Sequence, residues 1–185
     1  ILLAIYFSKD ITSRLTILAD NADRLAKEKE LNPQLAGNDE IAQLDRVFHV
    51  TAMALDEARH KERAVFDNSQ DVVCVVSPDG SFTSMNPASE KMFGYSKEEM
   101  LERSLYSITQ QDDQQQTRDA LNSDFGAQGR LNFENRIVKK DGSVINVLWS
   151  ASRSKDDLMT YCIAHDITSR KELEQLKQEF LAMVS

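Results

Sequence analysis

Apolar residues in the first third of the chain recur every three or four positions, the spacing of one face of an α-helix. One run spans residues 8–30, and Pro33 breaks it because proline lacks an amide proton. A second run begins after Gly37 and continues as a charged helix through residues 56–66. The positions on this face are Ile11, Leu15, Leu18, Ala22 and Leu25 in the first run, then Ile41, Leu44, Phe48, Thr51 and Leu55 in the second. Two such helices bury little surface alone, so we expect a second copy of the chain to complete a four-helix bundle.

The central section changes to the period of β-strands, separated by turn and helix signals. Strands are predicted at residues 72–76, 82–85, 130–139, 144–153 and 158–164. Between the second and third, Asn86-Pro87 predicts a capped helix that Gly94 ends, and the capping box Ser96 to Glu99 begins another, which runs to Arg103. A polar helix is predicted over 112–125. Two strands, three short helices and three strands make an α+β domain.

The end of the chain returns to a helical pattern without a stop signal. Leu173, Leu176, Phe180 and Met183 follow in steps of three and four, so one face is suited to a partner helix. No Gly, Pro or polar cap follows Lys177 before Val184. We therefore expect a terminal coiled-coil helix.

Composition and scattered reactive residues exclude several functions. A net charge of −8 without a basic stripe argues against nucleic-acid binding. Cys74 and Cys162 lie in apolar runs and are expected as buried free thiols in a reducing compartment. The three histidines, at positions 49, 60 and 165, are too far apart in sequence to indicate a metal site. No catalytic residue set and no phosphate-binding loop is present, so no catalytic residue is assigned.

Residues 1–7 are apolar and uncharged. They are too few to cross a bilayer, and a core helix end or a signal-peptide remnant are alternatives. We interpret them as the end of a transmembrane helix, with Tyr6 at the interface and Lys9 and Arg14 just inside. This interpretation puts the rest of the chain on the cytoplasmic side of the inner (cytoplasmic) membrane.

Residues 8–57 resemble a HAMP domain, the parallel four-helix relay found just inside the membrane in bacterial receptors. Asp39-Glu40 match the acidic pair that begins its second helix, and Leu44, Phe48 and Met53 follow in the expected rhythm. Arg14 departs from the family, in which many members have a proline early in the first helix. The resemblance implies a signal-relay role for Asp39 and Glu40, with residues 58–66 as a connecting helix.

Residues 64–168 resemble a PAS domain, which we assign to 67–168. The resemblance rests on Ser77-Pro78-Asp79-Gly80, Asn86-Pro87-Ala88, Phe93-Gly94-Tyr95, Lys140-Asp141-Gly142 and Asp166-Ile167-Thr168. It implies a cupped five-stranded antiparallel sheet with helices over one face. In this family the closing triplet links the sensor to the effector helix, which implies relay roles for Asp166 and Thr168.

The resemblance also raises the question of a bound cofactor. Residues 103–108 lack the reactive cysteine of flavin-binding relatives, and 112–125 lack a haem-ligating histidine, so no cofactor is expected within the chain. The candidate pocket lining is Phe93, Met100, Phe133, Ile137, Val147, Trp149, Tyr161 and Ile163. We favour the interpretation that these side chains fill the core.

Residues 169–185 resemble the start of the dimerisation helix of sensor histidine kinases, because Phe180-Leu181-Ala182-Met183-Val184-Ser185 matches the segment before the phosphoacceptor His. The resemblance implies a homodimer, a response-regulator partner, and ATP with Mg in a domain beyond this chain. The alternatives are the same sensor module on a diguanylate cyclase or chemoreceptor, and a non-enzymatic PAS dimerisation module.

Overall fold

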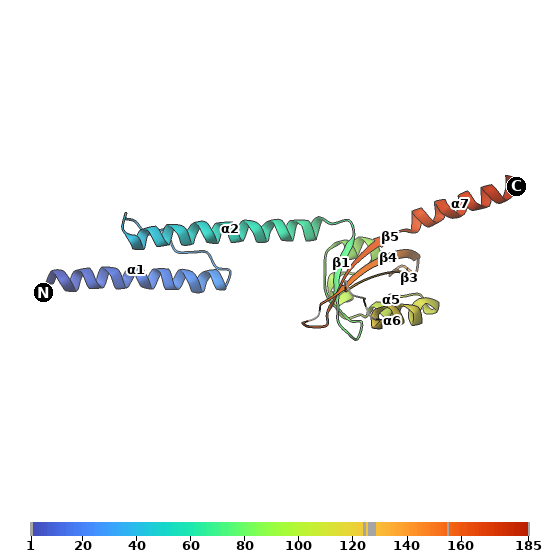
Figure 1. Ribbon diagram of the computed structural model, residues 1–185, viewed down its shortest axis with the longest axis horizontal. Helices are drawn as coiled ribbons and strands as arrows, with labels where there is room; N and C mark the ends of the chain where they lie inside the picture. The colour runs from blue at the N-terminus through green and yellow to red at the C-terminus, as the bar shows by residue number, and fades with distance from the viewer. Residues whose placement is uncertain (1, 124, 126–128, 155, 185) are drawn as a thin grey trace. The chain divides into compact units, whose positions relative to one another are not determined.

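The computed structural model describes residues 2–123, 125, 129–154 and 156–184. The chain divides into two compact units, residues 1–63 and 64–185, which we call the two-helix unit and the sheet unit. Helix α2 begins in the first and ends in the second (Figure 1). Each unit is considered by itself below.

The two-helix unit consists of α1 (Leu2–Ala26), a connector over residues 27–39, and the larger part of α2 (Glu40–Asn68). The predicted end of the first helix near Glu30 is wrong. The chain leaves the helix at Lys27, and Glu28 takes a left-handed conformation with φ of 54°. No described helix is both long and apolar enough to span a membrane. The transmembrane interpretation of residues 1–7 stays a prediction, and Ile1 and the side chains of residues 2–8 lie outside the description.

The sheet unit contains the predicted five-stranded antiparallel sheet (Figure 1). Its strands are β1 (Val72–Val76), β2 (Phe82–Met85), β3 (Arg130–Val138), β4 (Val144–Arg153) and β5 (Thr160–Asp166). The spatial order is β2-β1-β5-β4-β3. The first and last strands of the unit are therefore neighbours in the middle of the sheet.

Short helices link β2 to β3, and a longer one follows β5. They are α3 (Ala88–Phe93), α4 (Lys97–Leu101), α5 (Leu105–Ile108), the 3₁₀ helix η1 (Gln111–Asp113), α6 (Gln114–Asn122) and, after the sheet, α7 (Thr168–Val184). Gly94, with φ of 79°, ends α3, and the Ser96–Glu99 capping box begins α4, both as predicted. The sequence did not predict α5, and the polar helix is shorter than expected.

Aromatic side chains form the centre of the core. The Trp149 ring stacks with the rings of Phe93 and Phe133, whose centroids lie 6.4 Å and 6.1 Å from its own. Its Nε1 donates to the buried Asn135 Oδ1 at 2.8 Å, and Asn135 Nδ2 donates to Thr117 Oγ1 at 2.9 Å. This polar contact fixes β3 and β4 to α6 inside an otherwise apolar interior.

Six of the eight candidate pocket residues are buried in this core: Phe93, Met100, Phe133, Ile137, Val147 and Trp149. That they line a ligand pocket stays a prediction. The inward assignment is wrong for Tyr161 and Ile163, which are 51% and 47% exposed. On β5 it is Cys162 that faces inward, opposite Cys74 of β1, so both of its neighbours face the other side of the sheet.

Candidate functional site

The places where the chain enters and leaves the sheet lie on adjacent strands. Val72, at the start of β1, pairs with Ala164, near the end of β5. Just before β1, the Asp71 carboxylate contacts the His165 ring through Oδ1 and Nδ1 at 2.5 Å. The end of α2 and the start of α7 are thus connected through one pair of strands and one side-chain contact.

Asn86 organises the entry. Its side chain is fully buried, and its Nδ2 donates to the carbonyls of Phe66 at 3.0 Å and Asp71 at 2.9 Å. Its Oδ1 accepts from Val73 N at 3.0 Å. The predicted capping role is wrong, because the side chain makes no cap and Pro87 occupies the N-cap position of α3. Asn86 instead ties the last turn of α2 to the first residues of β1.

Asp166 and Thr168 organise the exit, where β5 becomes α7. Asp166 Oδ1 accepts from Thr168 N at 2.8 Å, which satisfies an amide at the helix start. Thr168 Oγ1 accepts from Asn146 N at 2.9 Å, and Asn146 O accepts from Ile167 N at 2.9 Å. Ile167 is 2% exposed. The triplet therefore fastens the start of α7 to β4 by two hydrogen bonds and one buried side chain.

Ion pairs hold the first turn of α7 over the neighbouring strand. Glu134 of β3 contacts Lys171 Nζ at 2.6 Å and Arg170 at 3.4 Å.

A second ion pair joins β3 to η1. Arg136 of β3 forms a two-point ion pair with Asp113, whose carboxylate also accepts from the Arg136 amide. The Arg136 guanidinium lowers the pKa of Asp113, so this carboxylate stays ionised well below neutral pH.

The other two predicted relay residues lie in the two-helix unit. Asp39 precedes α2 and accepts from Ala42 N at 2.9 Å, while its carboxylate pairs with both terminal nitrogens of Arg14 on α1. Arg14 lowers the pKa of Asp39 far below its usual range. Glu40 is the first residue of α2. Arg14, which the sequence marks as a departure from the HAMP pattern and as a basic residue near the predicted membrane end, is the ion-pair partner of Asp39.

Neither thiol is placed for covalent chemistry. Cys74 and Cys162 are free, buried and paired across β1 and β5. The hydrogen bond that the Cys74 thiol makes to Cys162 and its burial both raise the pKa of Cys74, which keeps this thiol in the unreactive protonated form. Within the described residues, no group of three or more His, Cys, Asp or Glu is arranged to hold a metal.

The sequence therefore predicts the residues where the chain leaves the sheet, but not the contacts where it enters the sheet. Asp166 and Thr168 are brought together with β4, while Asp39 and Glu40 lie in the other unit. For Asn86 the sequence predicts a helix cap, and it predicts no role for Asp71. Their partners are distant in the chain, and the sequence alone carries no signal that joins them.

Comparison with known proteins agrees with this architecture. A family model described as the PAS fold matches residues 82–160. The PAS domain of an HTR-like protein from Haloarcula marismortui superposes with a TM-score of 0.57 and 26% identity, covering 64% of this chain and 99% of that one. The sheet unit has the PAS fold.

Two curated relatives are sensor kinases. The signal transduction histidine-protein kinase AtoS of Escherichia coli (strain K12) is 31% identical over 102 residues, which cover 55% of this chain and 16% of AtoS. The sensor protein kinase WalK of Staphylococcus haemolyticus (strain JCSC1435) is 24% identical over 203 aligned residues, which cover 100% of this chain and 31% of WalK. This PAS module is therefore similar to the sensor regions of histidine kinases, and the chain spans less than a third of either relative.

Proposed function

We propose that this chain is the signal-relay part of a membrane-bound sensor histidine kinase of a two-component system. In this proposal residues 8–57 form a HAMP domain, residues 67–168 are a PAS sensor, and α7 continues into the helix that carries the phosphoacceptor His. ATP and Mg act in a further domain, and the phosphoryl group passes from that His to a response regulator. Residues 1–7 end a transmembrane helix, so the chain lies on the cytoplasmic side of the membrane.

The observation that carries the proposal is the apolar stripe on α7. Four side chains at heptad spacing are exposed in the single chain: Leu173 (68%), Leu176 (62%), Phe180 (62%) and Met183 (78%). A soluble protein rarely leaves so regular an apolar row uncovered, and the same row of a second chain is its natural partner. The stripe lies within residues 169–185, the segment that resembles the start of the kinase dimerisation helix. Ser185, the last residue of that resemblance, lies outside the described residues.

The geometry of the sheet supports a relay between α2 and α7. Movement of the last turn of α2 acts on Asn86, which is bonded to Phe66, Asp71 and Val73. Since β1 pairs with β5, a shift of β1 is passed to the strand that becomes α7. The Asp166–Thr168 contacts then set how the first turn of α7 leaves the sheet. If this junction can pack in two ways, α7 can leave the sheet in two directions and so act as a switch, because packed elements move between discrete arrangements.

Dimerisation through α7 is tested by sedimentation of the whole chain. Leu176→Glu places a charge in the stripe, whereas Gln178→Glu adds the same charge on the opposite face of the helix. Burial of a leucine stabilises by about 2 kcal/mol per copy, so Leu176→Glu should raise the dimer dissociation constant at least about tenfold. Gln178→Glu should leave it unchanged. A wild-type chain that stays monomeric at high concentration, or equal effects of the two variants, would count against the proposed dimer.

A further inference from the structure

Buried polar side chains hold the connector of the two-helix unit in place. Asn21 Oδ1, on α1, accepts from Asn32 N at 2.8 Å and from Asn32 Nδ2 at 2.9 Å. Asp45 Oδ2, on α2, accepts from Leu35 N at 2.7 Å. Asn21 and Asp45 are both 0% exposed. The segment between the helices is therefore fixed by specific polar contacts rather than by apolar packing alone.

His49 completes this set of contacts with both ring nitrogens. Its Nδ1 lies 2.9 Å from the carbonyl oxygen of Asp45, and its Nε2 lies 3.1 Å from the carbonyl oxygen of Asn32. Carbonyl oxygens only accept hydrogen bonds, and a neutral imidazole has one N–H, whereas an imidazolium has two. The protonated ring is the form that satisfies both contacts.

The nearby carboxylate favours the same form. Asp45 Oδ1 lies 3.4 Å from His49 Nδ1 and has no hydrogen-bond partner within the part of the chain that is described. A buried carboxylate is costly without a counter-charge. The Asp45 carbonyl raises the pKa of His49, with the Asn32 carbonyl and the Asp45 charge adding to it, and partial burial of the ring works in the opposite direction.

The other charges around this site do not change in the same pH range. On α1, Asp20 pairs with Arg24 at 2.6 Å, and its carboxylate also accepts from Asn32 Nδ2 at 2.6 Å. The Asn32 and Arg24 contacts lower the pKa of Asp20, so it stays ionised. The connector contributes the main-chain carbonyl of Glu30, which accepts from Arg24. Of these groups, the imidazole is the one whose ordinary titration lies near neutral pH.

We propose that His49 holds the connector in place only when its ring is protonated, and we call this residue the fastener. When the ring is protonated it bonds the connector at Asn32 and neutralises Asp45. When it loses its proton, one of the two ring contacts loses its hydrogen and the buried carboxylate loses its counter-charge, which loosens the segment from Asn32 to Leu35. The two-helix unit then responds directly to the pH around it, whatever effector follows α7.

The direction of the response follows from the raised pKa. The extra stability is fully present below the unfolded-state pKa of His, about 6.5, and is lost as pH rises through the higher folded-state pKa. Acidification from neutral pH should tighten the connector, and alkalinisation should release it.

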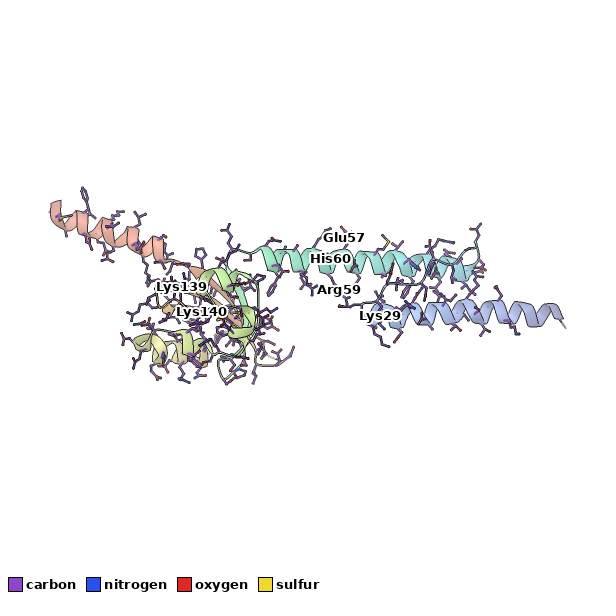
Figure 2. The ribbon with its side chains drawn as sticks, turned by 180° about the vertical axis from the view of Figure 1, so that it is seen from behind. Lys29, Glu57, Arg59, His60, Lys139 and Lys140 are labelled. Atoms are coloured by element: carbon purple, nitrogen blue, oxygen red, sulfur yellow. The ribbon has the colours of Figure 1, made fainter. Side chains whose placement is uncertain are left out.

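The test is an NMR titration of His49 in the whole chain, and His60 supplies the matched control variant. His60 lies on the same helix (Figure 2) and, like His49, follows an aspartate by four positions. Its Nε2 lies 3.5 Å from Asp56 Oδ2, but its side chain is 74% exposed. His49 should titrate above the ordinary imidazole value of about 6.5, and below its titration midpoint both of its ring nitrogens should carry hydrogen. A His49 midpoint at or below about 6.5, or a single neutral tautomer at mildly acidic pH, would overturn the proposal.

Hydrogen exchange at the Leu35 amide measures the mechanical consequence. Relative to the unfolded-chain rate, its protection should fall as pH rises, by about tenfold for each unit by which the pKa of His49 is raised. The pH dependence should vanish in His49→Gln and persist in His60→Gln. Protection that is independent of pH in the wild-type chain refutes the fastener even if either variant fails to fold.

Discussion

Thr168 offers the sharpest test of how the start of α7 is fastened to the sheet. Thr168→Val keeps the shape of the side chain and removes the oxygen that accepts from Asn146 N at 2.9 Å. A lost hydrogen bond costs about 1 kcal/mol net, and up to about 3 kcal/mol where the remaining donor finds no new partner. At about 1.4 kcal/mol per factor of ten, protection of the Asn146 amide should fall between about 5-fold and about 150-fold.

The assay is amide hydrogen exchange of the sheet unit within the whole chain, read residue by residue. Thr168→Ser retains the hydroxyl and is the matched control, so it should keep most of the wild-type protection. The loss should be confined to the exit junction, including the amide of Ile167, which donates to Asn146 O. Unchanged protection of Asn146 in Thr168→Val would refute the view that the side chain fastens α7 to β4. Equal losses across all strands would do the same, because they would indicate global destabilisation.

Three further changes probe the sheet unit. Trp149→Phe keeps the ring stack but removes the donor to Asn135, and it should lower the free energy of unfolding by about 1–3 kcal/mol in urea titrations; no change would mean that the buried amide is satisfied in another way. Asp113→Asn removes the closer of the two carboxylates that pair with Arg136, the other being Asp112 at 3.7 Å. Because Arg136 lowers the pKa of Asp113, the ion pair stabilises the fold fully above the unfolded-state pKa of about 3.9, and this stabilisation is lost as pH falls through the folded-state pKa. In Asp113→Asn the free energy of unfolding should therefore depend less on pH in the acid range. An acid-range pH dependence equal to that of the wild-type chain would contradict this. Gly80→Ala puts a methyl group at φ of 91° against the ring of a core tyrosine and should destabilise the unit, whereas wild-type thermal stability in this variant would mean that the turn relaxes freely.

Local signals predicted the sheet well. The ends of β1, β2 and β4 agree with the structure, since each strand has β-branched or alternating residues bounded by a turn. β5 begins two residues later than predicted, after Leu158, which adopts a left-handed conformation with φ of 59°. The faces of β5 were misassigned because the facing of Cys162 depends on partners in β1 and β4. Those partners come from distant parts of the chain.

The sequence predicts only part of the candidate site, because several of its contacts join residues far apart in the chain. Asp166 caps an amide two residues away, so a local pattern reveals it. Asn86 also has a familiar local pattern before a proline, yet its side chain bonds to Phe66, Asp71 and Val73, up to 20 positions away. A buried amide that bonds to distant main-chain groups looks the same in sequence as a helix cap. The fastener at His49 depends likewise on the fold of the connector.

In the proposed function, α7 passes a signal from the sheet to a phosphoacceptor His. The most direct measurement is autophosphorylation, in membranes and with labelled ATP, of the longer kinase that the proposal implies. We predict phosphate on a His beyond Ser185, at a rate that the Asp166→Ala, Thr168→Val double variant changes while the protein stays dimeric. The 185-residue chain alone should incorporate none. Phosphate on the isolated chain, no phosphohistidine in the longer protein, or a rate indifferent to the double variant would contradict the account.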